Sequence, residues 1–418
     1  MKFIADFHVH SRYSRATSKN MEVETMGKWA EIKGINLLGT GDFTHPLYLA
    51  ELKAKLKPSD GNLLTLKNGN KKVRFVLTAE VNNIFPQAGK LRKIHTLIFA
   101  PTLDVVDKIN AKLERLGKLS SDGRPTFGFH VKDLVKLVLD ISEDCFLVPA
   151  HAWTPWFSLF GANSGFDSLE ECFEKQSEHI YAIETGLSSD PEMNWRLSSL
   201  DKITLISNSD AHSPAKIGRE ANVFDCDLNY NQIIKCLREK DSNKLLSTIE
   251  FFPEEGKYHY DGHRKCGILF SPNESEDNGN ICPVCKKGVT IGVLHRVETL
   301  SDRPKGFMPE GAIPSIHLIP LDEIIAEVFG CGVNTIKVRR EYDKMISKAE
   351  NELNILLDLS RDELTGLTQP NILEGIMKVR EGKMRITPGY DGVYGKISVR
   401  GEEREEINEE VPKKTELS

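Results

Sequence analysis

Short apolar runs alternate with amphipathic stretches from residue 2 to about residue 250, and this alternation limits the possible folds more than any other feature. The strand-like runs are Lys2–His8, Ile35–Gly41, Val73–Val81, Ile94–Ala100, Cys145–Ala150, Ile180–Glu184 and Ile203–Ser207. The helical stretches between them include Glu22–Lys33, Leu47–Leu56, Val105–Leu116, Val131–Ile141 and Pro191–Leu200. Strands that alternate with helices pair in parallel through right-handed crossovers. Seven such units favour a closed α/β barrel over an open sheet, although the sequence alone leaves closure open.

The composition changes after residue 255. Residues 256–300 are rich in Gly, Asn, Cys and His, which is typical of a small metal-stabilised module. From Leu321 to about Arg385, apolar residues recur at helical spacing over Asp322–Phe329, Thr335–Leu357 and Asn371–Lys383. We therefore expect four parts, which are a barrel at 1–255, a zinc-finger module at 256–300, a mainly helical domain at 301–400 and an acidic, disordered tail at 401–418.

Charge and cysteine usage narrow the class of protein. The chain has 418 residues, eight cysteines and a formal net charge of −6. Seven glutamates against three basic residues give residues 401–418 a charge of −4, which leaves −2 for the other 400 residues. No run approaches the roughly 18 apolar residues of a membrane span, and the N-terminus lacks a signal-peptide pattern. We expect a cytoplasmic protein with no membrane partner and no disulfide framework.

Histidines and carboxylates gather at the ends of the predicted strands. They are His8, His10, Asp42, His45, Glu80, His95, His151, Asp210 and His212. A single histidine is more often a core or surface residue than a ligand. Six imidazoles and three carboxylates converging on one face of a barrel would repel or desolvate one another without a cation, however. The pattern therefore predicts a metal cluster, and mixed imidazole and carboxylate ligation suits Zn, Mn or Fe.

Two segments resemble the PHP (polymerase and histidinol phosphatase) domain. Asp6-Phe7-His8-Val9-His10-Ser11 is similar to its first motif, and Asn208-Ser209-Asp210-Ala211-His212 is similar to its last. The resemblance implies a distorted (β/α)7 barrel with up to three divalent metals (Zn, Mn or Mg). Carried over by position, it implies one metal on His8, His10, Glu80 and Asp210, a second on Glu80, His95 and His151, and a third on His45 and His212 with Asp42 as a further candidate.

One motif departs from the family pattern. The usual second motif places Asp directly before His, whereas this chain reads Gly41-Asp42-Phe43-Thr44-His45-Pro46. Whether Asp42 or His45 binds the third metal therefore stays open.

The chemistry of such a cluster is the hydrolysis of a phosphoester by water that the metals activate. His8, His10, Glu80 and Asp210 are the expected catalytic group. Arg12, in the loop after the first strand, is a candidate for holding phosphate oxygens, and a plain solvated loop is the equal alternative.

A second metal site is predicted from two pairs of closely spaced ligands. His263-x-x-Cys266 is followed by Cys282-x-x-Cys285, a spacing typical of a tetrahedral structural zinc. Cys282 and Cys285 alone could form a redox pair, but the His-x-x-Cys partner favours zinc. His259 and His295 lie close by in the sequence, so the choice of ligands stays open.

Basic residues cluster around the predicted zinc module. They include Arg264, Lys265, Lys286, Lys287 and Arg296, and further basic groups lie at 337–344 and 378–385. One such group is usually a solvated helix face. Their repetition after a phosphoesterase cluster favours a nucleic-acid substrate. The small net charge of the whole chain hides this local concentration of basic residues.

Three further runs resemble endonuclease Q, a family that joins a PHP barrel to a zinc finger and a helical domain. They are residues 257–266, Ile281-Cys282-Pro283-Val284-Cys285 and residues 292–298. The resemblance implies a DNA-repair endonuclease that nicks double- or single-stranded DNA 5′ to a deaminated base (hypoxanthine, uracil or xanthine) or an abasic site. It makes residues 301–400 a DNA-binding domain. A sliding clamp is a further candidate partner, without a convincing clamp-binding peptide in the sequence.

Two other functions remain as alternatives. A PHP phosphatase for a small phosphomonoester would need neither a zinc module nor basic helices. A DNA-binding scaffold with a decayed barrel would have lost some of the ligands.

A damaged base must leave the duplex before a barrel of this kind can reach it. Trp153 and Trp156, just after His151, are candidates for stacking on that base, and a hydrophobic plug is the equal alternative. Glu184, at the end of the sixth predicted strand, is a candidate contact to the base or to a metal-bound water.

Overall fold

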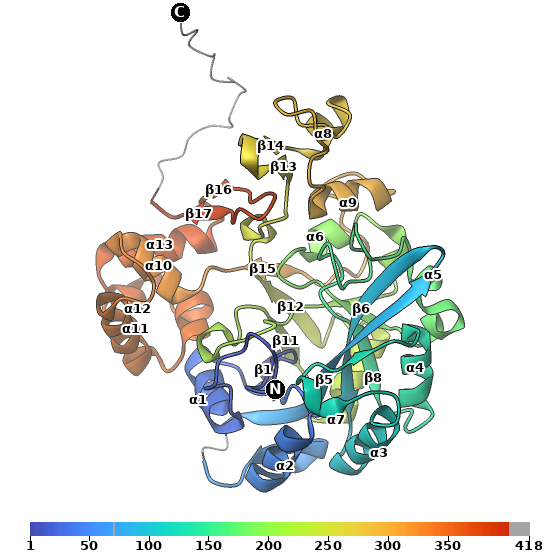
Figure 1. The fold of residues 1–418 in the computed structure, drawn as a ribbon. Coiled ribbons are helices and arrows are strands. Elements are labelled where there is room, and N and C mark those ends of the chain that lie inside the picture. Colours follow the sequence, from blue (N-terminus) through green and yellow to red (C-terminus); the bar gives the residue numbers. More distant parts are fainter. Residues whose placement is uncertain (70–71, 401–418) are drawn as a thin grey trace, which may run out of the picture.

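Seven strands follow one another around the core of the N-terminal region (Figure 1). They are β1 (Lys2–Asp6), β2 (Leu37–Gly39), β5 (Arg74–Gln87), β6 (Lys90–Ala100), β8 (Phe146–Pro149), β9 (Ala182–Glu184) and β10 (Thr204–Ile206). Ladders join β1, β2, β5, β6 and β8 in this order, and a separate ladder joins β9 to β10. The ring closes through the hydrogen bond from Ala152 N–H to the Glu184 carbonyl (2.9 Å) and through a bridge between Val9 and Ala211. The distorted α/β barrel is thereby confirmed.

The computed structural model describes residues 1–69 and 72–400. The acidic tail predicted at 401–418 lies outside the described residues. Within the described ranges no helix is long and apolar enough to cross a membrane.

The expectation of parallel pairing throughout was wrong for two neighbouring pairs. β1–β2, β2–β5 and β9–β10 are parallel, but β5–β6 and β6–β8 are antiparallel. β5 and β6 form a long hairpin whose two-residue turn, Ala88 and Gly89, has positive φ values of 49° and 74°. A two-residue connection of this kind can only join antiparallel strands.

Further strands widen the sheet beyond β1. The order β15–β12–β11–β1 adds three strands that the alternation pattern did not reveal, β11 (Ala221–Asp225), β12 (Leu245–Glu250) and β15 (Ser315–His317). β15 pairs in parallel with β12, so a segment that follows the predicted zinc module returns to the barrel. Short strands complete the edge near β5, namely β3 (Leu56–Ser59), β4 (Leu63–Leu66) and β7 (Thr126–Phe127).

Helices cover the outside of the barrel. They are α1 (Val23–Lys33), α2 (Pro46–Lys55), α3 (Leu103–Leu113), α4 (Val131–Leu139), α5 (Leu169–Phe173), α6 (Pro191–Asn194) and α7 (Tyr230–Glu239). α7 shows why such segments are helical, because Asn229 caps its first turn and Ile233, Ile234 and Leu237 lie buried on one face. Inside the barrel, the Phe7 ring packs against Phe99 and Phe224.

The region of the predicted zinc module stands at one end of the molecule (Figure 1). It contains β13 (Asp261–His263), β14 (Ile268–Phe270), α8 (Pro272–Asp277) and α9 (Val293–Leu300). The antiparallel pair β13–β14 frames the first ligand pair, because His263 ends β13 and Cys266 lies in the turn before β14.

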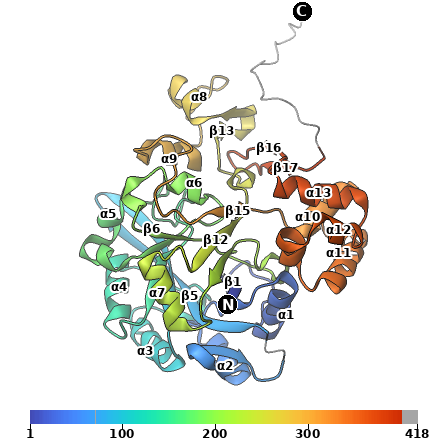
Figure 2. The same cartoon turned by 180° about the vertical axis from the view of Figure 1, so that it is seen from behind.

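The remaining helices form a group beside α1, as both views show (Figures 1 and 2). They are α10 (Leu321–Phe329), α11 (Ile336–Ala349), α12 (Arg361–Thr365) and α13 (Pro370–Arg380), followed by the hairpin β16 (Arg385–Thr387) and β17 (Lys396–Ser398). The expected helix at 335–357 is shorter, because α11 ends at Ala349 and a separate helical turn follows at Asn354–Asp358. The domain boundaries at 255, 300 and 400 stay predictions.

Candidate metal centre

The ends of the barrel strands bring two groups of ligand atoms together. His8, His10 and Asp210 form one group, and Glu80, His95 and His151 form the other. Within each group the ligand atoms lie within 4.8 Å of one another. Five of the six residues are buried, and Asp210 is partly exposed. The groups match the two metal positions predicted first and second from the sequence.

Glu80 connects the two groups. Its Oε2 lies 3.3 Å from His10 Nε2 and 3.6 Å from His8 Nε2. Its Oε1 lies 2.7 Å from His95 Nδ1 and 3.1 Å from His151 Nε2. One carboxylate therefore faces both groups, so Glu80 could be shared between metals that the two groups would hold.

Polar atoms without partners test whether these residues fit a metal. His8 Nε2, His10 Nε2 and Asp210 Oδ1 are buried and make no hydrogen bond, although the last two lie 3.0 Å apart. Buried polar atoms in proteins are nearly always hydrogen-bonded. Nitrogen and oxygen atoms that face one another in a buried group are suited to surround a cation, so the donor set fits divalent metals.

The charges of the site lead to the same conclusion. Burial alone would lower the pKa of His8, but the carboxylates of Glu184 and Glu80 raise it well above its usual value. Burial would likewise raise the pKa of Glu80, yet His95, Arg124 and His8 hold it well below its usual range. The carboxylates thus favour positive charge at this place, which a divalent cation supplies.

Two further carboxylates orient the histidines from the other side of their rings. Asp42 Oδ1 lies 3.0 Å from His10 Nδ1, and Glu184 Oε1 lies 3.1 Å from His8 Nδ1. A carboxylate on Nδ1 fixes the tautomer and leaves Nε2 to face the cluster. Glu184, predicted to contact a base or water, is fully buried and also accepts from the His151 backbone N–H (2.8 Å). It therefore acts here as a positioning residue.

The structure does not bring Asp42, His45 and His212 together as a third ligand group within the described residues. The second oxygen of Asp42 accepts hydrogen bonds from the N–H and Oγ of Ser11, both at 2.6 Å. The His45 ring stacks on Tyr13, with centroids 4.4 Å apart. The His212 ring lies beside His10, with centroids 4.5 Å apart. Asp42 thus holds His10, and its role as a metal ligand is not supported by this arrangement.

Strained backbone places several of these side chains. Asp42, His151 and Asp210 have positive φ values of 45°, 33° and 46°, which are uncommon for residues with a side chain. Such conformations cluster where a site requires them. Gly186, which follows β9, also has a positive φ (62°), and a Cβ there would lie 2.6 Å from the Cβ of His151.

Arg124 belongs to the site, and the sequence reasoning missed it. Its Nη1 donates a hydrogen bond to Glu80 Oε2 (3.0 Å), and its side chain is 24% exposed. Glu80 raises the pKa of Arg124. Arg124 lies in a loop without a motif, so only its packing against Glu80 reveals it. The Asp-Gly pair just before Arg124 was a weak signal in the sequence. The structure explains this glycine, because a Cβ on Gly123 would meet Asp42 Oδ2 at 2.3 Å.

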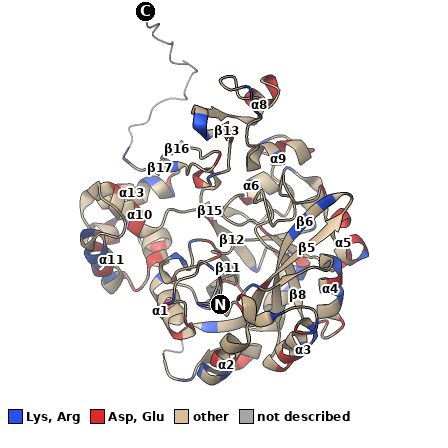
Figure 3. Cartoon of the chain, viewed as in Figure 1, with Lys and Arg blue, Asp and Glu red and all other residues tan. Residues whose placement is uncertain are grey.

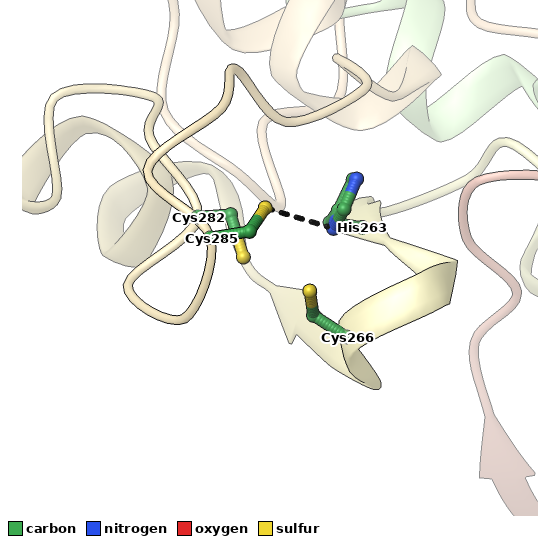
Figure 4. A group of neighbouring side chains, drawn as sticks. All are labelled: His263, Cys266, Cys282 and Cys285. Carbon is green, nitrogen blue, oxygen red and sulfur yellow. Dashed lines mark hydrogen bonds between the residues drawn. The ribbon is translucent and has the colours of Figure 1, made fainter.

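The predicted zinc ligands also assemble. Ligand atoms of His263, Cys266, Cys282 and Cys285 lie within 4.8 Å of one another, and Cys285 Sγ is 3.6 Å from His263 Nδ1 (Figure 4). His295 lies outside this group, since its Nδ1 pairs with Asp261 (2.5 Å). Three thiols and one imidazole are a donor set that suits a structural zinc.

The predicted contacts to DNA divide into two kinds. Arg264 and Lys265 are exposed on the zinc module, where Figure 3 shows Lys and Arg on the ribbon beside β13. Arg12 instead pairs with Glu22 (2.7 Å) and Glu51 (2.5 Å). Arg296 donates to the Phe160 carbonyl (2.9 Å), so it fastens α9 to the barrel. Arg12 and Arg296 therefore have internal partners.

The two tryptophans also differ. Trp153 is fully buried, and its Nε1 donates to Asn194 Oδ1 (2.8 Å). It is a core residue and is not available to stack on a base. Trp156 is 40% exposed and contacts the Tyr258 ring, with centroids 5.4 Å apart. The stacking prediction therefore stays with Trp156.

A cavity of about 450 Å³ lies at Trp156, between the barrel and the region of the zinc module. Aromatic and other side chains line it, including Thr154, Trp156, Phe157, Tyr258, His259 and Tyr394. Its wall touches the metal centre, because Thr154 Oγ1 lies 3.2 Å from His151 Nδ1 and the Phe157 ring lies 5.0 Å from the His95 ring. The cavity is large enough for a nucleobase.

Comparison with known proteins decides the family. The crystal structure of the lesion-specific endonuclease PfuEndoQ from Pyrococcus furiosus is similar over 95% of both chains, with 30% identity and a TM-score of 0.85. The chain belongs to the endonuclease Q family. A structure of endonuclease Q in complex with a 27-mer duplex that carries an abasic lesion at the active site also matches, with 30% identity and a TM-score of 0.83 over 95% of this chain and 96% of that one.

Two sequence relatives extend the comparison. The uncharacterized protein YqxK of Bacillus subtilis is 30% identical over 95% of this chain and 99% of its own length. The uncharacterized protein MJ0043 of Methanocaldococcus jannaschii is 36% identical over 62% of this chain, a match that spans 33% of MJ0043. Residues 320–383 match the family described as the MJ0043 C-terminal domain. The similarity to known proteins therefore includes the helical region as well as the barrel.

Proposed function

We propose that this chain hydrolyses the phosphodiester 5′ to a deaminated base (hypoxanthine, uracil or xanthine) or an abasic site in DNA. As a member of the family, the chain is a metal-dependent hydrolase and a DNA-repair endonuclease. The observation that carries the finer proposal is the pair of ligand groups joined by Glu80, next to a cavity lined with aromatic side chains. Metals held by these residues would activate water for hydrolysis of the phosphodiester, and the cavity would receive the base beside it.

The residues of each group would hold one divalent metal, with Glu80 shared between them. When bound, the metals activate water and stabilise charge on the attacking and leaving oxygens. Asp42 and Glu184 keep the Nε2 atoms of His10 and His8 directed at the cluster. We propose zinc, manganese or magnesium as the metals, one in each of the two groups.

Arg124 would bind the phosphate of the DNA. Its guanidinium lies at the edge of the cluster and is held there by one hydrogen bond to Glu80. The same group has further N–H donors, and arginine forms strong charge-assisted hydrogen bonds with phosphate oxygens. The exposed Arg264 and Lys265 would contact the DNA backbone from the zinc module.

The cavity at Trp156 would receive the extruded base. Deaminated and mispaired bases cost less to unpair than normal ones, which is one source of selectivity. Trp156 and Tyr258 line the cavity, and their aromatic rings are candidates for stacking on the base. We expect Trp156→Ala to weaken binding to a duplex with a deoxyinosine by roughly 5- to 150-fold, since stacking on an aromatic ring contributes about 1–3 kcal/mol per base.

The assay for cleavage uses a labelled duplex with one deoxyinosine or deoxyuridine and Mg²⁺ or Mn²⁺. A discrete nick 5′ to the damaged base supports the proposal. Asp210→Asn should lower its rate by a factor of about 100 or more, because losing the charge of a direct ligand costs at least as much as losing a residue behind one. The exposed Asp60→Asn serves as a matched control and should nick like the unmodified chain. Hydrolysis of a monoester such as histidinol phosphate, without any nicking, would instead establish the phosphatase alternative.

The four zinc ligands make a separate test possible. We expect Cys282→Ser to lower the zinc content by one equivalent and to weaken DNA binding, while barrel folding is retained. Unchanged zinc content would refute the ligand assignment.

A further inference from the structure

The side-chain amide of Asn208 lies directly behind the metal centre. Asn208 comes shortly after β10, and it is fully buried. Its Nδ2 donates a hydrogen bond to Glu184 Oε1 (2.8 Å). The same carboxylate oxygen lies 3.1 Å from His8 Nδ1. Asn208, Glu184 and His8 therefore form a row of hydrogen-bonded side chains that ends at a candidate metal ligand.

Two donors fix the direction in which the Asn208 amide points. Its Oδ1 accepts hydrogen bonds from the Phe7 backbone N–H (2.9 Å) and from Asn222 Nδ2 (3.1 Å). The Asn222 amide is itself held in place, because its Oδ1 accepts from the Ser207 backbone N–H (3.0 Å). A reversed Asn208 amide would set its NH2 group against two donors and its oxygen against a carboxylate. The Nδ2 of Asn208 therefore has to face Glu184.

Both oxygens of Glu184 are engaged with donors that the fold holds in place. Oε1 accepts from Asn208, and Oε2 accepts from the His151 backbone N–H (2.8 Å). His8 Nδ1 lies 3.1 Å from each oxygen, so the carboxylate is centred on this imidazole. Glu184 is fully buried, and a buried carboxylate that loses a donor is costly to keep in the same place. The position of Glu184 opposite His8 thus depends on both donors.

We propose that Asn208 is a positioning residue of the metal centre, which acts on His8 through Glu184. Its amide directs the carboxylate so that His8 Nδ1 donates to it and His8 Nε2 faces the cluster. Asn208 also holds the backbone of Phe7, the residue before His8, so it fixes the main chain and the side chain of this ligand together. The inference rests on the proposed role of His8 as a metal ligand.

Asn208→Asp tests this role because it removes only the donor. The new carboxylate can still accept from Phe7 and Asn222, but it faces the carboxylate of Glu184 and repels it. We expect the Mn²⁺ affinity to fall by about 10- to 100-fold. Isothermal titration calorimetry with Mn²⁺ alone measures this on the full chain with zinc already bound at the cysteines. If Asn208→Asp does not fold, Asn208→Ala removes the same donor without adding a charge, with the same expectation.

An exchange of donor and acceptor separates positioning from a general loss of packing. In Glu184→Gln alone, a single amide oxygen cannot accept from both Asn208 and His151. In the chain with both Asn208→Asp and Glu184→Gln, the new amide donates to the new carboxylate and still accepts from the His151 N–H. We expect this chain to bind Mn²⁺ at least about twofold more tightly than Asn208→Asp alone. An affinity no higher than that of Asn208→Asp would overturn the inference.

Asn194→Asp is the matched control. Asn194 is also fully buried, its Oδ1 accepts from Trp153 Nε1 (2.8 Å), and its Nδ2 donates to the Asp190 carbonyl (2.7 Å). The same change at Asn194 removes a donor that does not bind Glu184, and it should keep the Mn²⁺ affinity of the unmodified chain. An unchanged affinity in folded Asn208→Asp, or an equal fall in both variants, overturns the inference. If the unmodified chain binds no Mn²⁺, the proposed metal centre itself is refuted, and this inference with it.

Discussion

Individual side chains at this site act through the groups they orient as much as through direct ligation. Asp42 illustrates this, because both of its oxygens are engaged, one with His10 and the other with Ser11. In the sequence, Asp42 is a candidate metal ligand. A carboxylate at a strand end looks the same there whether it binds a metal or holds a histidine that does. Only the direction of the side chain separates the two roles.

Asp42→Asn tests the positioning role. We expect metal affinity to fall by about 10- to 100-fold, because a neutral amide orients the imidazole less firmly than a carboxylate. The measurement is the Mn²⁺ concentration at which nicking reaches half of its maximum, with Asp60→Asn as the control. An unchanged Mn²⁺ dependence together with an unchanged maximum rate would contradict this role.

Glu255 provides a pH-dependent prediction away from the metal centre. Burial and the nearby Glu323 raise the pKa of Glu255 to about 8, although Lys216 opposes the shift. The folded chain therefore keeps the Glu255 proton that the unfolded chain releases near pH 4.5. Stability is then present at low pH and is lost as the pH rises through about 8.

Glu255→Gln carries a permanently neutral side chain and should remove this loss. We expect its free energy of unfolding to exceed that of the unmodified chain by about 2 kcal/mol at pH 8.5 and to differ little at pH 5. Urea denaturation at both pH values measures the difference. Glu239→Gln, exposed on α7, should show no such pH dependence. A constant difference across this range would count against the raised pKa.

At the scale of elements, the ends of strands decide the geometry of the centre. The His-x-His pair after β1 and the Asp-x-His pair after β10 follow from strand periodicity and were predicted. The bridging position of Glu80 depends on the β5–β6 hairpin, because β5 continues past Glu80 and pairs antiparallel with the strand that carries His95. The register opposes Glu80 to Leu97 and Asn82 to His95, which places both ligands on neighbouring strands.

Gly186, in the turn after β9, should tolerate no side chain. Ala at this position would place a Cβ 2.6 Å from His151 Cβ and 2.8 Å from its Cα. We expect Gly186→Ala to lower the free energy of unfolding by roughly 2–4 kcal/mol and to lower nicking strongly, since His151 must move.

Gly89→Ala is the matched control, because Gly89 has a similar positive φ (74°) with nothing within 4 Å of an added Cβ. It should show only the strain of the left-handed backbone, about 1 kcal/mol, with nicking retained. Thermal unfolding and the nicking assay are measured on both chains. Equal losses of activity in the two variants would exclude a specific collision with His151.

At the scale of the whole molecule, a buried ion pair joins the C-terminal helices to the barrel. Lys33 Nζ on α1 lies 2.5 Å from Glu352 Oε2, which also accepts from the Tyr342 hydroxyl (2.5 Å). Both charged side chains are nearly inaccessible, at 6% and 4% exposure. A buried pair of this kind contributes to the choice of one docking geometry, and removal of one partner leaves an unpaired charge.

Lys33→Met should therefore destabilise the packing of these helices on the barrel. We expect a loss of about 2–4 kcal/mol in the free energy of unfolding, and earlier proteolysis between residues 321 and 400. Glu352→Gln in the same chain should restore part of the loss, since it removes the unpaired charge. Lys136→Met, which breaks an exposed pair with Asp140, should change the stability by less than about 0.5 kcal/mol. A similar small change for Lys33→Met would show that the pair does not hold the helices.

The sequence by itself determined the local chemistry of this protein. Spacing of two along a strand presents His8 and His10 together, and paired short spacings present the ligands of the zinc module, because both depend on residues that are near one another in the chain. It also determined the α/β class and the helical C-terminal region through apolar periodicity. These signals do not require knowledge of distant contacts.

The tertiary structure decided everything that depends on which distant segments meet. It turned β5 and β6 into a hairpin, buried Trp153 while leaving Trp156 at a cavity, and engaged Arg296 within the protein. It also brought Arg124 to Glu80, 44 residues away in the chain. In the sequence, a charged residue that lies in solvent cannot be told from one, such as Arg124, that lies against a metal ligand. Packing distinguishes them, because only burial and partner geometry set the cost of leaving a charge unpaired.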